Sequence, residues 1–185
     1  MSLQQQKKLA ELKSESIKYS EQRERSLLEK KSIMLEEIKD QTINFLKSED
    51  FEVKDLPHQQ TISADYKGLV ITVKYSKVDD WFFGAHSMFE IHYEKKQYNV
   101  AASLKTESLP SFQGIFSSPQ EKLEKEIAYY EELVPKQKQL GTSDITGEYT
   151  LKLTTHSQDN RQVPQNKDTK IISSITDALS EIFNV

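Results

Sequence analysis

The stretch Leu69-Val70-Ile71-Thr72-Val73-Lys74-Tyr75 carries large apolar side chains at every second position, beginning with Leu69. The same alternation recurs over residues 86–93 and again over residues 98–104, after a short polar connection. Because successive side chains of a strand point to opposite faces, this pattern gathers the apolar side chains on one face. The three runs therefore predict an antiparallel sheet with one buried and one solvated face, and the buried face needs helices to cover it.

Further elements are expected on both sides of these runs. Residues 61–66 and 148–154 predict additional strands, which gives a sheet of four to five strands. Ser118-Pro119-Gln120-Glu121 combines an N-cap serine, a proline suited to the first helical turn and a capping glutamate, so it predicts a helix that ends before Pro135. The predicted class is α+β, with the antiparallel sheet covered by helices. A final helix is expected to bury one apolar side, made of Ile171, Ile175, Ala178 or Leu179, and Ile182.

A long polar helix is expected at the N-terminus, because residues 3–49 contain no proline or glycine and are rich in good helix formers. A heptad frame that starts at Leu3 finds apolar residues at only half of its seam positions, which makes a weak coiled coil. Residues 27–48 carry a better apolar stripe. We therefore expect residues 1–26 to be a polar helical extension and residues 27–185 to be a single α+β domain, with a mobile polar loop over residues 155–168.

Composition excludes several classes of protein. The 185 residues include 25 basic and 29 acidic side chains, giving a net charge of -4, and no segment is basic enough to favour nucleic acid as a partner. The absence of cysteine excludes disulfides, thiolate metal sites and cysteine nucleophiles. No segment approaches the roughly 18 consecutive apolar residues of a membrane-spanning helix, and the first residues show no secretory leader. We expect a cytoplasmic protein that has no contact with membranes.

Catalytic and metal-binding motifs are not apparent. The sequence lacks the short motifs of phosphate-binding loops, dinucleotide-binding folds, esterases and zinc proteases. His86, Glu90 and His92 share one strand face, but His86 and Glu90 are expected roughly 13 Å apart at the usual rise per residue, too far for one ion. The remaining two ligands are fewer than zinc usually takes from a protein. We expect no metal, no cofactor and no catalytic residues.

One aromatic segment, Val78-Asp79-Asp80-Trp81-Phe82-Phe83-Gly84, has two interpretations. It connects two predicted strands and contains the only tryptophan of the chain. Its rings could cap one end of the core. Alternatively they could anchor a partner protein, because large aromatic side chains dominate binding hot spots. In the second interpretation the contact residues are Asp79, Asp80, Trp81, Phe82 and Phe83.

The N-terminal extension also has two interpretations. It could be a solvated helix, or an arm that binds another protein or a second copy of the chain through Leu9, Leu12 and Ile17. With no catalytic motif, the sequence favours a non-catalytic protein-interaction module: an adaptor, an inhibitor or an assembly or chaperone-like factor. The alternative is a small enzyme or nucleic-acid-binding protein whose site is dispersed along the chain.

Overall fold

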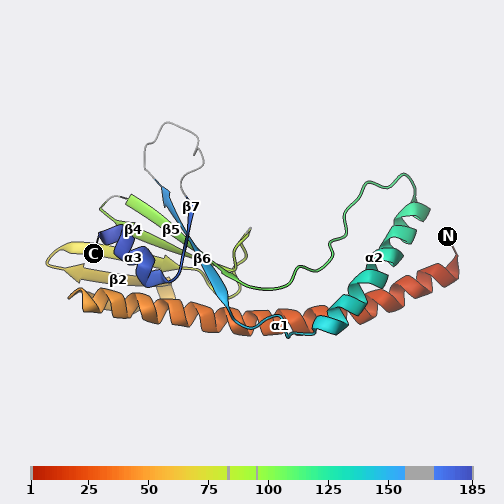
Figure 1. Ribbon diagram of the computed structural model, residues 1–185, viewed down its shortest axis with the longest axis horizontal. Coiled ribbons are helices and arrows are strands. Elements are labelled where there is room, and N and C mark those ends of the chain that lie inside the picture. The colour runs from red at the N-terminus through yellow and green to blue at the C-terminus, as the bar shows by residue number, and fades with distance from the viewer. Residues whose placement is uncertain (1, 83, 95, 157–168, 185) are drawn as a thin grey trace. The chain divides into compact units, whose positions relative to one another are not determined.

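A computed structural model describes residues 2–82, 84–94, 96–156 and 169–184. Over these ranges the chain forms three α-helices and one antiparallel sheet of seven strands, in which neighbours in sequence are neighbours in the sheet (Figure 1). The helices are α1 (Leu3–Ser48), α2 (Pro119–Leu140) and α3 (Ile175–Phe183). A short 3-10 turn, η1 (Pro57–Gln59), joins the first two strands. The strands are β1 (Glu52–Leu56), β2 (Thr61–Tyr66), β3 (Leu69–Tyr75), β4 (Ser87–Tyr93), β5 (Lys96–Leu104), β6 (Tyr149–His156) and β7 (Thr169–Ile172).

The α+β class, the antiparallel sheet and the long N-terminal helix are confirmed. The strands expected at 61–66, 69–76, 86–93, 98–104 and 148–154 are present with ends within two residues of the prediction. The predicted number of four to five strands was too low, because β1 and β7 at the two edges were missed. Of the loop expected over 155–168, the first two residues belong to β6 and the others lie outside the described residues.

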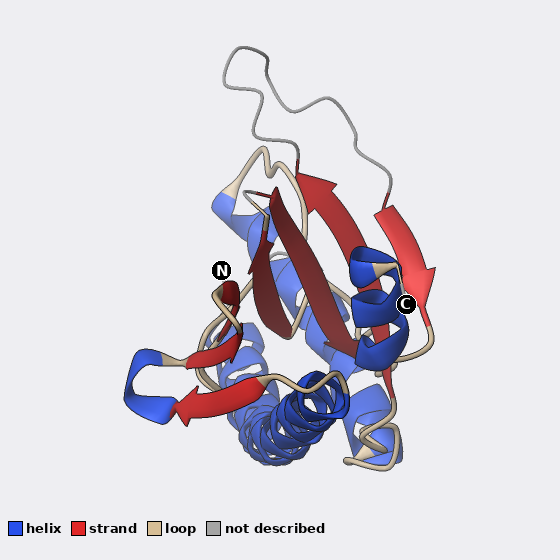
Figure 2. Ribbon diagram, turned by 90° about the vertical axis from the view of Figure 1, so that its left-hand side faces the viewer, coloured by secondary structure: helices blue, strands red, loops and turns tan. Residues whose placement is uncertain are grey.

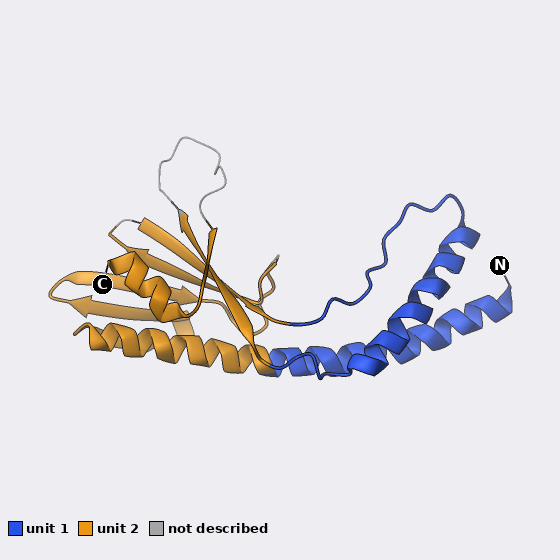
Figure 3. Cartoon of the chain, in the orientation of Figure 1, with its two compact units in different colours: residues 1–29, 106–146 blue, residues 30–105, 147–185 orange. Residues whose placement is uncertain are grey.

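The chain divides into two compact units (Figure 3). Unit 1 contains residues 1–29 and 106–146, and unit 2 contains residues 30–105 and 147–185. Helix α1 contributes its first part to unit 1 and its last part to unit 2. The pairing of α2 with the start of α1 was not anticipated from the sequence, whereas the expected boundary after residue 26 stays a prediction.

The core of unit 2 lies on one face of the sheet. Residues paired directly across neighbouring strands share a face, and the row formed by Ile62, Val73, Ile91 and Tyr98 is buried throughout. Helix α3 lies against the sheet (Figure 2), and it meets the unit 2 part of α1 where the Phe45 and Phe183 ring centroids are 6.1 Å apart. The alternation seen in the sequence therefore marks the buried face over the middle of the strands, whereas Leu69 at the start of β3 is 39% exposed.

The last helix begins later than predicted. Ile171 was expected on its buried side, but it belongs to β7 and is 72% exposed. Ser174 ends the strand region and caps α3, because its hydroxyl accepts the Asp177 main-chain N–H at 3.0 Å. Ile175 and Ile182 are buried as expected. The four-residue spacing from Ile171 to Ile175 matches one turn of a helix, but the two residues lie on opposite sides of the Ser174 cap, where α3 begins.

Helix α2 extends beyond its predicted end. It was expected to stop before Pro135, but it continues to Leu140. A proline inside a helix lacks one main-chain N–H and weakens the helix locally. Val134 and Gln137 are buried on either side of Pro135, and their packing holds the last turns in place. The N-terminal cap is confirmed, since the Ser118 hydroxyl accepts the Glu121 N–H at 3.1 Å.

Candidate functional site

The aromatic loop, residues 76–86, connects β3 to β4 and is held at its start by two hydrogen bonds between Ser76 and Met88. Ser76 donates its N–H to the Met88 carbonyl at 3.0 Å, and the Ser76 hydroxyl accepts the Met88 N–H at 3.1 Å. Asp80 closes a turn, because its carboxylate accepts the Lys77 N–H at 2.7 Å. Asp80 therefore holds the loop in shape, while Asp79 is exposed.

Lys31 of α1 contacts the aromatic loop at Asp80 and Trp81. This lysine is only 3% exposed, and its ammonium group donates to the Asp80 main-chain carbonyl. The same ammonium nitrogen lies 5.8 Å from the centroid of the Trp81 ring, within range of a cation–π interaction. Burial lowers the pKa of Lys31, and the charges of Asp80 and Asp79 partly oppose that effect. A buried cation is thus placed between a helix and the loop that carries the tryptophan.

Trp81 itself is 67% exposed. It does not occupy the interior of unit 2, as a residue capping the core would. Phe82 forms a β-bridge with Ala85, and the Ser103 hydroxyl donates to the Gly84 carbonyl at 3.2 Å. Phe83, the remaining aromatic residue proposed from the sequence, lies outside the described residues.

The three apolar residues proposed on the N-terminal extension separate into two environments. Leu9 is buried in unit 1 against Leu123 and Ile127 of α2, and Leu12 packs at the edge of the same cluster. Ile17 is not part of this cluster and is 56% exposed. Leu9 and Leu12 are therefore occupied by contacts within the chain, and Ile17 is the residue of this set that remains accessible.

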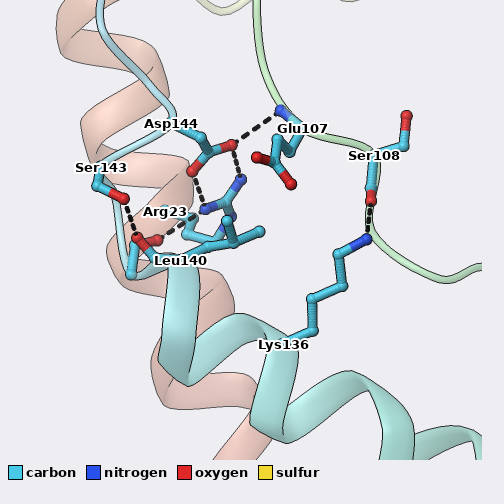
Figure 4. Close-up of polar contacts among 8 residues, drawn as sticks. Arg23, Glu107, Ser108, Lys136, Leu140, Ser143 and Asp144 are labelled. Carbon is cyan, nitrogen blue, oxygen red and sulfur yellow. Dashed lines mark hydrogen bonds and ion pairs between the residues drawn. The ribbon is translucent and has the colours of Figure 1, made fainter.

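Polar side chains continue the packing between α1 and α2. The buried Gln137 side chain accepts from the Ser16 hydroxyl and donates to the Ser20 hydroxyl, both at 3.0 Å. One turn further, Arg23 forms an ion pair with Asp144 (Figure 4). Ser20 and Arg23 lie in residues 20–26 of α1, a stretch with no apolar residue. Their partners are more than 100 residues away, so no local signal could have identified them.

The histidines and acids of β4 do not assemble a metal site among the described residues. His92 and Glu90 contact each other on the exposed face of the sheet, and Lys74 lies 3.9 Å from the same carboxylate. The described part of the chain contains no group of three or more metal-ligating side chains suited to one ion. Two hollows along α1, one between Ala10 and Gln22 and one between Ser32 and Asn44, are each lined by that helix alone and enclose no site.

No family model, no curated protein and no solved structure matches the chain. Within the described ranges, every helix is too short or too polar to cross a membrane. The function must therefore be inferred from the residues of the chain, and the aromatic loop is the strongest candidate for a functional site among them.

Proposed function

We propose that this chain is a non-catalytic protein-binding module and that Trp81 of the aromatic loop is its main anchor. The observation that carries the proposal is the pairing of a 67% exposed tryptophan with a 3% exposed lysine beneath it. A solvated indole is a large apolar surface, whereas a buried ammonium group is costly unless hydrogen bonds or opposite charges compensate its desolvation. Here it fixes the loop that presents the ring.

Preorganisation makes such a ring effective in binding. The loop is held by Ser76 at its start, by Lys31 from the helix and by Ser103 at Gly84. Ordering a loop at the moment of association costs free energy, and a loop that is already ordered avoids most of that cost. Tryptophan has only two side-chain torsions to fix, so it buries much area for little entropy.

The charge beside the ring indicates the chemistry of the partner. Asp79, two residues before Trp81, is exposed, and Asp80 is engaged within the loop. Complementary charges at the rim of an interface steer association and select partners. The partner is therefore expected to offer an apolar pocket for the indole, bordered by lysine or arginine near Asp79. Ile17 in unit 1 is a separate candidate contact, for which a second copy of the chain is the occupant to test.

The experiment compares Trp81→Ala with Ile171→Ala, a matched control that removes an equally exposed apolar side chain from the edge strand. Proteins captured from the source cells by the wild-type chain are quantified against both variants, and a captured protein is then purified for calorimetry. Trp81→Ala is expected to weaken binding at least tenfold and to leave the melting temperature unchanged, while Ile171→Ala binds like wild type. Equal affinity of Trp81→Ala and wild type for every captured protein would contradict the proposal.

A further inference from the structure

His86 joins the end of the aromatic loop to the sheet through both its main chain and its ring. Its N–H donates to the Ala102 carbonyl at 2.8 Å, and its ring nitrogen Nδ1 lies 3.1 Å from the Leu104 main-chain nitrogen. A main-chain N–H can only donate, so Nδ1 must accept and must be unprotonated. We infer from this donor that the ring is neutral with its proton on Nε2.

The charges around the ring oppose a second proton. Lys31 faces it from α1, and beyond Lys31 lie Asp79 and Asp80 of the loop. On β5 the group that meets the ring is a main-chain N–H, and the next ionisable side chain, Lys105, is paired with Glu148 at 3.1 Å. Burial and the charge of Lys31 lower the pKa of His86.

We propose that His86 is an acid-sensitive latch for the aromatic loop. In its neutral form it holds the end of the loop to β5. Protonation removes the acceptor for the Leu104 N–H and places a second cation near Lys31, the residue that supports Trp81. Both effects favour a released loop in which the imidazolium is solvated. The structural switch stands on this geometry, and its consequence for binding rests on the proposed function.

The size of the effect follows from proton linkage. Release takes up one proton, so the ratio of released to latched loop rises up to tenfold for each pH unit below the ordinary histidine pKa of about 6.5, until the latched form itself titrates. If the ordered loop is the binding form, affinity for a partner falls by the same factor once the released form dominates. The module is thus expected to dissociate from its partner in an acidic environment.

The test uses the full chain and protons alone, followed by NMR between pH 5 and 8. The Leu104 amide signal reports the hydrogen bond to His86, and the Trp81 indole N–H signal reports the position of the aromatic loop. The His86 ring signal gives the pKa of His86. His86→Asn is the matched variant, because its amide oxygen replaces the Nδ1 acceptor and does not titrate. His92→Gln, on the exposed sheet face, removes a histidine that lies outside the latch. Wild type and His92→Gln should show both reporters moving with one midpoint below about 6.5, and His86→Asn should show neither.

A His86 midpoint at or above 6.5 in the wild-type chain would overturn the proposal, as would reporters that stay still while His86 titrates. Persistence of the full transition in His86→Asn would also overturn it. If His86→Asn does not fold, the wild-type titration alone decides between these outcomes. None of these measurements needs a partner, so failure of the proposed function leaves the latch standing. If the NMR reporters show release within this range, Trp81-dependent binding that stays constant from pH 5 to 8 would contradict only the expected consequence for binding.

Discussion

Arg23 and Asp144 form a two-point ion pair in unit 1, with Nη1–Oδ1 and Nη2–Oδ2 distances of 2.6 and 2.8 Å. The same guanidinium donates to the Gly141 carbonyl at 2.7 Å, and the carboxylate also accepts the Glu107 N–H at 2.9 Å. One arginine thus ties α1 to the end of α2 and to the segment that follows β5 (Figure 4). Planar, bidentate geometry of this kind is specific to arginine.

Removing this arginine should destabilise the helix pair. In Arg23→Ala the Asp144 carboxylate loses its partner in a largely buried position, and we expect the free energy of unfolding to fall by roughly 3 kcal/mol. The free energy of unfolding of Arg23→Lys should lie between those of the wild type and Arg23→Ala, because lysine keeps the charge but not the two parallel hydrogen bonds. Urea unfolding followed by circular dichroism measures the change. Arg25→Ala, an exposed neighbour on the same helix, is the control, and equal stability of the two alanine variants would refute the role given to Arg23.

Acid should weaken the same contact. The Arg23 hydrogen bond holds the pKa of Asp144 at about 2, below its ordinary value of 3.8. Because the pKa is lower in the folded than in the unfolded chain, the stabilisation is complete above pH 3.8 and is lost as the pH falls toward 2. Unfolding curves at pH 5, 4 and 3 should therefore show a loss in wild type that is smaller in Asp144→Asn. Glu121→Gln accounts separately for Glu121, whose pKa is also about 2 at the surface.

The sequence predicted the central strands because their alternation reports burial directly. It missed β1, since Glu52-Val53-Lys54-Asp55-Leu56 is an edge strand in which charged residues interrupt the pattern. At the site, the lone Trp81 was recognised, but its exposure depends on how the loop is held. Lys31 lies in the apolar stripe of residues 27–48. A lysine at such a position was the one sequence signal that pointed to its contact with the Trp81 ring. The Arg23–Asp144 pair depends on tertiary structure alone.

A buried hydroxyl in unit 2 is expected to cost stability. The Ser87 side chain is fully buried on the apolar face, and its oxygen has no hydrogen-bond partner among the described residues. Its cross-strand neighbour is Ala102. An alanine at position 87 fits the same space, because it lacks only the hydroxyl oxygen of serine. Ser87→Ala should raise the free energy of unfolding by about 1 kcal/mol, because an unsatisfied polar group is removed. Ser103→Ala, which loses a bond to Gly84, should not be stabilised, and a destabilised Ser87→Ala would show that the hydroxyl is satisfied.

Helix α3 should be a structural part of unit 2. Ile175 and Ile182 are buried, and truncating either to alanine should lower the free energy of unfolding by roughly 2–5 kcal/mol, from lost transfer energy and the cavity left behind. Ile171→Ala makes the same chemical change at a 72% exposed position and should shift stability by less than about 0.5 kcal/mol. Chemical denaturation of the three variants checks this. Similar losses of free energy of unfolding in all three variants would mean that α3 does not pack into unit 2 through Ile175 and Ile182.

The first part of α1 should be needed for α2 to stay helical. From its polar sequence, residues 3–26 would be removable without a change in melting temperature. The structure supports the opposite expectation, because Leu9 and Ser16 pack against α2 and Arg23 holds its end. A chain lacking residues 1–26 should lose the hydrogen-exchange protection of α2, since most of the stability of a helix in a protein comes from tertiary packing rather than from helix propensity. Unit 2 contains none of the deleted residues and should keep its protection.

Two point variants make this last test specific to packing. Leu9→Ala removes a buried side chain from the α1–α2 cluster and is expected to cost roughly 2–3 kcal/mol, with exchange protection lost first in α2. Ile17→Ala changes the 56% exposed position on the same helix and should leave that protection intact. Because alanine suits a helix, neither variant disturbs α1 through propensity. Unchanged protection of α2 in both Leu9→Ala and the truncated chain would mean that α2 stands without α1, and the N-terminal extension would then be free to serve as a separate binding arm.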